Sequence, residues 1–191
     1  MTVETPPVKN PDAPAEHAHS LLQSALDAPL RRKHGLNVLF ADEEKRPAVK
    51  TWAEWQDKSQ MDGDVRLLHQ QAIRPITCWG YVTGVGGLWA IDFDATWLYG
   101  LWRKRFGVRA ETLTVETPNT GVRPYFLCKQ PVTNNRFKET LHAELEGPGR
   151  FTITAGAIRR ADGSMGEYHI AVEKPILRDD RMPADTLATC R

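Results

Sequence analysis

A chain of 191 residues is long enough for one domain with a substantial core, and its formal net charge of +1 gives no overall attraction to nucleic acid. Any nucleic-acid site must therefore be a local basic surface. The three cysteines, Cys78, Cys128 and Cys190, are far apart and lack Cys-x-x-Cys spacing. We therefore expect neither zinc nor a disulfide framework. There is no apolar run long enough for a membrane helix and no signal-peptide core after Met1, which favours a cytoplasmic protein without a membrane partner.

The N-terminal residues 1–18 carry four prolines, mixed charges and almost no large apolar side chain. This composition predicts a disordered leader. Ser20 is placed to cap a first helix that ends near Gly35. We expect the folded domain to span residues 19–177 and a C-terminal tail to span residues 178–191.

The middle of the chain begins with a short apolar strand at residues 79–84. Residues 84–87 predict a tight turn into a second strand that ends at Asp94, which is a hairpin signal. A helix is predicted over residues 96–106 because apolar and aromatic side chains recur at helical spacing and Gly107 follows. We interpret its stripe, which includes Trp97 and Leu101, as core packing in preference to base stacking.

The strand at residues 87–94 contains the most informative motif, Asp92-Phe93-Asp94. Successive strand side chains point to opposite faces, so Asp92 and Asp94 project together while Ile91 and Phe93 pack behind them. Two unpaired carboxylates on one face repel each other, and a divalent cation removes the conflict. Two-metal nucleotidyl transfer is the chemistry most naturally served. The alternative is a solvated strand end with turn-forming aspartates.

Two later segments repeat the pattern of strand, glycine-containing turn and strand. They lie at residues 113–127 and 143–154, and the first contains Thr117-Pro118-Asn119-Thr120-Gly121 between its strands. Both segments end in alternating apolar and polar residues. This alternation is typical of strands with one buried face.

In this order, the motifs resemble those of the bifunctional primase–polymerase domains of plasmids and phages, a branch of the archaeo-eukaryotic primase superfamily. The resemblance covers roughly residues 20–176. It rests on five motifs in order. They are the Lys-x-Pro and Trp segment at residues 45–52, the Gly-x-Val-Thr-Gly strand at 80–84 and the Ile-Asp-x-Asp strand at 91–94. The last two are Thr-Pro-Asn-Thr-Gly-Val-Arg-Pro-Tyr-Phe at 117–126 and Glu-Leu-Glu-Gly-Pro-Gly-Arg-Phe at 144–151.

The resemblance implies an α+β fold in which a small mixed N-terminal module joins an antiparallel sheet like that of an RNA-recognition motif, with the active site in the cleft between them. It implies template-directed addition of deoxy- or ribonucleoside triphosphates to a 3′ hydroxyl, in plasmid- or phage-type DNA replication. The expected partners are single-stranded or primed template DNA and a replicative helicase, in the same chain or separate. By resemblance, Asp92, Asp94 and Glu144 hold two Mg²⁺ or Mn²⁺ ions.

The resemblance also implies a nucleotide site. Arg123 would hold phosphates, and the residues that would shape the pocket are Thr117, Asn119, Thr120 and Gly121. Lys50 is a further candidate for nucleotide contact. Basic residues beside the motifs are candidates for contact with template phosphates, although each cluster alone is typical of a solvated face: Arg103, Lys104, Arg136, Lys138, Arg159 and Arg160.

Two substitutions separate the chain from the pattern of that family. Arg123 replaces the usual histidine, which keeps a positive charge for phosphate but cannot titrate near neutral pH. Glu144 replaces the usual aspartate, which keeps the charge but lengthens the side chain. The rival interpretation is therefore a catalytically weakened or inactive nucleotide- or nucleic-acid-binding module of the same fold. A second rival is metal-dependent hydrolysis of phosphodiesters, which uses similar carboxylate sets.

Overall fold

The computed structural model describes residues 13–130, 132–136 and 143–189. Its helices are α1 (Ala13–Asp27), α2 (Pro29–His34), α3 (Asp62–Gln70), α4 (Thr96–Phe106) and α5 (Met182–Thr189). Its strands are β1 (Val38–Ala41), β2 (Cys78–Val82), β3 (Leu88–Phe93), β4 (Thr114–Glu116), β5 (Val122–Leu127), β6 (Asn135–Arg136), β7 (Ala143–Glu146), β8 (Phe151–Arg159), β9 (Met165–Val172) and β10 (Leu177–Arg178). The expected α+β class is confirmed.

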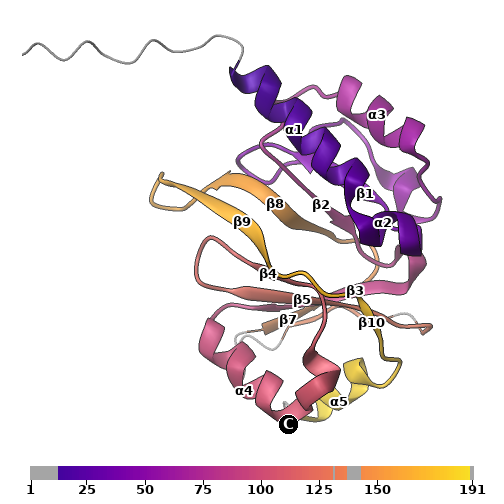
Figure 1. Cartoon of the computed structure of the whole chain (residues 1–191), viewed down its shortest axis with the longest axis vertical. Coiled ribbons are helices and arrows are strands. Elements are labelled where there is room, and N and C mark those ends of the chain that lie inside the picture. The colour runs from indigo at the N-terminus through magenta and orange to yellow at the C-terminus, as the bar shows by residue number, and fades with distance from the viewer. Residues whose placement is uncertain (1–12, 131, 137–142, 190–191) are drawn as a thin grey trace, which may run out of the picture.

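The strands form one curled sheet in the order β1-β2-β8-β9-β4-β5-β3-β7-β6, with β10 beside β5. All neighbours in this order are antiparallel, and the pair β10–β5 is parallel. Figure 1 shows the upper half, which consists of β1, β2 and β8 with α1, α2 and α3, above the lower half, which consists of β3, β4, β5 and β7 with α4 and α5. Strand β9 pairs with both β8 and β4 and so joins the two halves.

Two hydrophobic cores lie on opposite faces of the lower sheet. Trp89, Ile91 and Phe93 of β3 pack with α4 and α5, whereas Leu88 and Ala90 pack in the core shared with the upper half. This division follows from the alternation of strand side chains. The side chain of Asp92 therefore belongs to the inner face of the sheet, which faces the upper half.

The predicted hairpin at residues 79–94 was wrong. Strands β2 and β3 both form, but β2 pairs with β1 and β8, while β3 pairs with β5 and β7. The segment Val85–Gly87 carries the chain from the upper to the lower half. Both strands are almost fully buried. Because their apolar side chains suit many neighbours, the local sequence does not specify which strand becomes the partner.

The return from the lower to the upper half occurs at residues 147–150, beside the first crossing. The hydroxyl of Thr83 donates to the carbonyl of Gly147 at 2.6 Å, and a Cβ on Gly84 would lie only 2.7 Å from the Cα of Pro148. Gly84 also has a φ of +97°, which favours glycine. The glycines in these motifs therefore allow two crossing segments to pack in contact.

Other predictions for the helices had mixed outcomes. Helix α4 has the predicted bounds. The single first helix predicted to end near Gly35 is instead two helices, because α1 ends at Asp27 and Gly35 ends α2 in the left-handed conformation with a φ of +62°. The predicted start of the first helix was wrong, because α1 begins at Ala13 and Ser20 lies inside it. The expected boundary at residue 18 thus falls within a helix. The sequence at its beginning suits a helix N-terminus, because proline is favoured at the start of a helix and Glu16 places a negative charge in the first turn.

Candidate active site

The candidate carboxylates meet on the inner face of the lower sheet. Strands β3 and β7 pair antiparallel, with Asp92 directly opposite Glu144. Residues in this relation have Cβ atoms about 5 Å apart. Both side chains are mostly buried, at 27% and 16% exposure. Asp94 follows the last residue of β3 and is exposed. The β3–β7 register thus places next to each other two carboxylates that are 52 residues apart in the sequence.

Arg123 supplies the nearest positive charge. From the neighbouring strand β5, its Nη2 donates to Oδ2 of Asp92 at 2.9 Å, and its Nη1 donates to the carbonyl of Ile153 in β8 at 3.0 Å. Its side chain is only 7% exposed. Burial opposes the charge, but the carboxylates of Asp92 and Glu146 outweigh it and raise the pKa of Arg123 well above its ordinary value. The guanidinium of Arg123 thus supplies part of the positive charge that was expected beside Asp92.

Glu146 is a member of this site that the sequence analysis missed. Its Oε2 lies 3.3 Å from Nε of Arg123, but neither atom makes a hydrogen bond, and both are buried. Burial raises the pKa of Glu146 to about 7; the charges of Asp92 and Glu144 add to this rise, and Arg123 opposes it. The signal was available in the sequence, because Glu146 is two residues beyond Glu144 in a strand and must face the same side.

A second arginine contacts the site from the turn between β7 and β8. Nη2 of Arg150 lies 3.2 Å from Oε1 of Glu144. The Arg150 side chain is 41% exposed, in contrast to the buried Arg123. The inner face therefore carries the carboxylates of Asp92, Glu144 and Glu146, each paired with a guanidinium group, and one of the two guanidinium groups reaches solvent.

The predicted nucleotide-binding turn packs against the end of β3. Within it, the N–H of Thr117 donates to the carbonyl of Gly121 at 2.9 Å. A Cβ on Gly121 would lie 2.6 Å from the carbonyl oxygen of Phe93, so only glycine permits this contact. The hydroxyl of Thr96 in α4 donates to the carbonyl of Thr120 at 2.7 Å. The turn is thus held beside Asp94 and the start of α4, with Asn119 and Thr120 exposed.

The remaining predicted residues are distributed over the two halves. Lys50 is exposed in the segment after β1. Arg103 and Lys104 are exposed on α4, Arg159 pairs with Glu43, and Nη1 of Arg160 donates to the hydroxyl of Ser164 at 3.4 Å. Arg136 lies in β6, whose side chains are outside the described part of the structure, as is all of Lys138.

The fit of a divalent ion can be judged from the donors. Carboxylate oxygens are the ligands that Mg²⁺ and Mn²⁺ prefer, and the buried Oε2 of Glu146 has no hydrogen bond. Among the described residues, no three His, Cys, Asp or Glu side chains are already grouped as a metal site. In the present arrangement Asp92 and Glu144 are paired with arginines. The donor chemistry of these carboxylates fits a divalent ion, which would compete with the two arginines for them.

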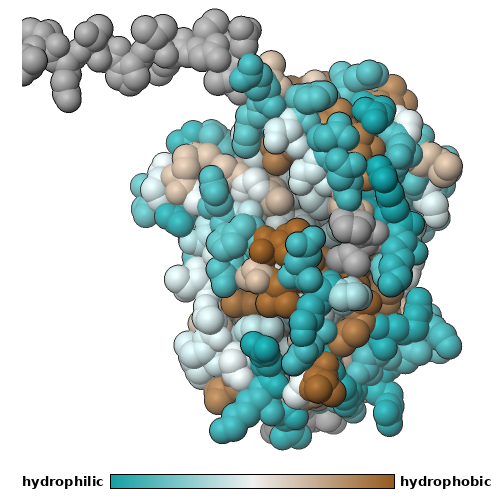
Figure 2. Space-filling model, viewed as in Figure 1, coloured by the Kyte–Doolittle hydropathy of each residue, from teal (hydrophilic) through white to brown (hydrophobic). Residues whose placement is uncertain are grey.

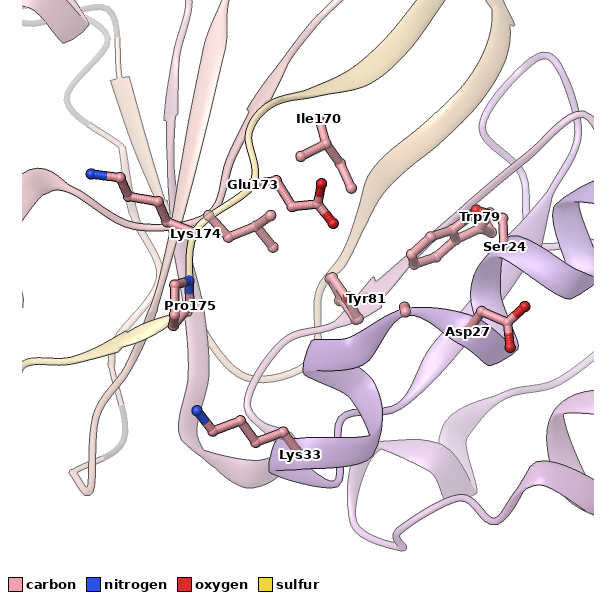
Figure 3. Close-up of a pocket in the computed structure, with 11 residues that line it drawn as sticks. Ser24, Asp27, Lys33, Trp79, Tyr81, Ile170, Glu173, Lys174 and Pro175 are labelled. Carbon is pink, nitrogen blue, oxygen red and sulfur yellow. The ribbon is translucent and has the colours of Figure 1, made fainter.

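A separate hollow of about 520 Å³ lies between α1, α2, β2 and the segment after β9 (Figure 3). Figure 2 shows that apolar residues gather around it in the middle of that face. Its walls include Trp79, Tyr81, Leu113 and Ile170, and charged side chains such as Lys33 lie around them. None of the predicted site residues lines it.

The chain was also compared with known proteins. No family model matches it, and no curated protein shows significant similarity to it. Among the described residues, none of the helices is both long and apolar enough to cross a membrane. A functional proposal must therefore rest on the motifs and on the geometry of this chain.

Proposed function

We propose that this chain is a nucleotidyl-transfer domain of the primase–polymerase type, which extends the 3′ hydroxyl of a primer on a DNA template. The observation that carries the proposal is the pairing of Asp92 with Glu144 in the β3–β7 ladder, with Asp94 at the end of the same strand. The turn at residues 117–121 contacts this strand end, so three motifs distant in the sequence converge. Their convergence supports the primase-type fold as part of the proposal.

Asp92 and Glu144, with Asp94, would hold Mg²⁺ or Mn²⁺. When bound, the ion supplies Lewis-acid chemistry that neutralises phosphate charge and makes a hydroxyl easier to deprotonate. Arg150, being partly exposed, would contact the phosphates of the nucleoside triphosphate. The exposed backbone and side chains of Asn119 and Thr120 would form the adjoining wall of the nucleotide site.

Arg123 would have a positioning role, which its surroundings support. Its contacts join β5 to a carbonyl of β8 and hold the carboxylate of Asp92 in one orientation. The guanidinium of Arg123 would in addition offer a charge-assisted contact to a phosphate oxygen. Because arginine stays charged across the physiological range, this contribution would not depend on pH near neutrality.

Primer extension tests the proposal. Wild type, Asp92→Asn and Glu144→Gln are incubated with primed template, nucleotides and Mn²⁺ or Mg²⁺, and the products are separated by length. We expect extension by wild type and a loss of roughly 100- to 1000-fold in each variant, the scale of removing one group that stabilises the transition state. The matched control is Glu116→Gln, which alters a strand carboxylate that pairs with His169 instead. Undiminished extension by Asp92→Asn contradicts the proposal.

A second candidate is a binding module that has lost the chemistry. The observation in its favour is that Arg123 already lies in ion-pair distance of both Asp92 and Glu146. For such a module, wild type binds primed DNA but extends nothing with either metal, and Arg123→His, which restores the residue of the resembled family, gains extension. Shortened products in the same assay would instead indicate hydrolysis.

A further inference from the structure

The outer face of α4 carries exposed apolar side chains. The helix buries Leu98, Tyr99 and Trp102 against the lower sheet, but Trp97 is 64% exposed and Leu101 is 60% exposed. The expectation that the whole stripe packs in the core was therefore wrong for these two residues. The reason is geometric: two neighbouring stripes of apolar residues follow this helix, and the sheet on one side of it can cover only one of them.

Trp97 differs from the other tryptophans of the chain. Trp55, Trp79, Trp89 and Trp102 are buried and Trp52 is half-buried. Exposing an indole leaves much apolar area in water, at roughly 25 cal/mol for each Å². An exposed Trp beside exposed apolar Leu101 is thus a feature to be explained by a ligand, because folding alone does not require it.

Positive charge accompanies this apolar surface. Arg103, Lys104 and Arg105 are exposed in the last turn of α4, and none of them makes an ion pair with a residue that the structure describes. A shallow hollow of about 520 Å³ lies beside them, lined by Gly100, Arg103, Lys104, Gly107, Val108 and Glu111. Two of these residues are glycines, and a Cβ added at Gly100 or Gly107 would meet open space. Glu111 is paired with Lys174, and the charge of Arg103 makes a smaller contribution to lowering its pKa.

The N-terminal end of this face lies beside the predicted nucleotide-binding turn, whereas the body of α4 covers the face of the sheet opposite Asp92. Trp97 follows Thr96, whose hydroxyl holds the carbonyl of Thr120 in the predicted nucleotide-binding turn. Asp94 is three residues before Trp97. From Trp97 to Lys104 the helix advances by about 10 Å. An aromatic surface at one end and unpaired cations at the other therefore extend away from the site along one helix.

We propose that the outer face of α4 binds single-stranded nucleic acid, with Trp97 stacking on a base and Arg103 and Lys104 contacting phosphates. This inference rests on the proposed function and names the surface that holds the template strand. The two chemical features match the two parts of a nucleotide, because every base has a flat face for stacking and every linkage has a negative charge. A protein partner would match the apolar side chains but has no general need for the unpaired cations.

Anisotropy of a fluorescein-labelled oligothymidylate tests the inference, without metal or nucleoside triphosphate. We expect Trp97→Ala to weaken binding by about 5- to 100-fold, which corresponds to one stacked base. Trp97→Phe keeps an aromatic face and should retain most of the affinity. The matched control is Leu101→Ala, an equally exposed neighbour without a π face, which should stay within about twofold of wild type. Arg103→Gln with Lys104→Gln should reduce the slope of log Kd against log salt by about 1.4.

Intrinsic fluorescence provides a second measurement. Stacking of a base on Trp97 should quench the emission of wild type, and Trp97→Phe should lose that quenching while it still binds the oligonucleotide. Wild-type affinity and an unchanged salt slope in these variants would overturn the inference. So would equal losses in Trp97→Ala and Leu101→Ala, which would indicate a general apolar surface.

The binding experiment and the primer-extension experiment can fail independently of each other. If Trp97→Ala loses affinity although wild type extends no primer, the binding surface stands and the proposed reaction fails. If wild type extends primers and Trp97→Ala binds normally, the reaction stands and the binding surface fails.

Discussion

Two buried carboxylates, one in each half of the sheet, have opposite environments. Asp42, after β1 in the upper half, is 3% exposed and accepts hydrogen bonds from the backbone N–H groups of Glu44 and Arg46 and from Nε of Arg46 at 2.8–3.0 Å. Burial alone would raise its pKa, but these bonds outweigh burial and lower the pKa. Glu146 in the lower half is 14% exposed, its Oε2 has no hydrogen bond, and its pKa is raised to about 7.

This difference in environment indicates a structural role for Asp42 and makes Glu146 a candidate for a functional role. Every described contact of Asp42 stabilises its ionised form, so the charge serves the loop after β1. At Glu146 the charges of Asp92 and Glu144 add to the effect of burial, the guanidinium of Arg123 opposes it, and polar atoms remain without hydrogen bonds. Buried polar atoms without a hydrogen bond call for an explanation, and carboxylates with strongly shifted pKa values are concentrated at active sites.

Replacing the arginine at each site should give the largest contrast. Arg123→Ala leaves Asp92 and Glu146 buried without their cation, and we expect the free energy of unfolding to fall by about 3–5 kcal/mol at pH 7. Arg46→Ala is the control. Its guanidinium is 55% exposed and Asp42 keeps its backbone donors, so we expect a loss of about 1 kcal/mol. Urea titration measures both. Equal losses would contradict the contrast between the two sites.

The pH dependence of stability should distinguish the two carboxylates next. The pKa of Glu146 is raised in the folded state above its ordinary 4.5, so the folded protein binds more protons than the unfolded chain between about pH 4.5 and 7. Stability from this group therefore falls as pH rises through that window. Relative to wild type, Glu146→Gln should gain up to about 3 kcal/mol between pH 5 and pH 8, at about 1.4 kcal/mol for each pKa unit.

Asp42→Asn is the matched control for that experiment. The pKa of Asp42 is lowered from 3.8, so its contribution is fully present above that value and is lost only as pH falls through the folded pKa. The difference between wild type and Asp42→Asn should therefore be constant from pH 5 to pH 8. If the curves for wild type and Glu146→Gln were also parallel over this range, the assignment of a raised pKa to Glu146 would be wrong.

The sequence predicted local features well where the signal was itself local. The helix at residues 96–106 has its glycine stop, and the strands of residues 113–127 form the pair β4–β5 across the predicted turn. The partners of β2 and β3 were not predictable in this way, because the sequence of a buried apolar strand does not specify which strand pairs with it. The sequence also did not specify which side of α4 packs against the sheet. Trp97 was therefore predicted to be in the core, although it is exposed.

The candidate site was predictable only in part. Alternation placed Asp92 on a polar face, and the resemblance named Glu144, but the register that puts them opposite each other depends on contacts between distant segments. The pairing of Arg123 with Asp92 also required the fold, since its strand position alone did not show whether it faces carboxylates or solvent. Glu146 could have been found by extending the alternation of β7 by two residues.

Crystals grown with Mn²⁺ and a nucleoside triphosphate give the most direct test of the central claim, because anomalous scattering locates the ion. We predict an Mn²⁺ peak at the carboxylates of Asp92 and Glu144, with the triphosphate beside Arg150 and the turn at residues 117–121. Crystals of Asp92→Asn grown in the same way should show no Mn²⁺ peak at these carboxylates. A wild-type map in which Arg123 still holds Asp92, with no Mn²⁺ at these carboxylates while the nucleotide is bound elsewhere, would contradict the account.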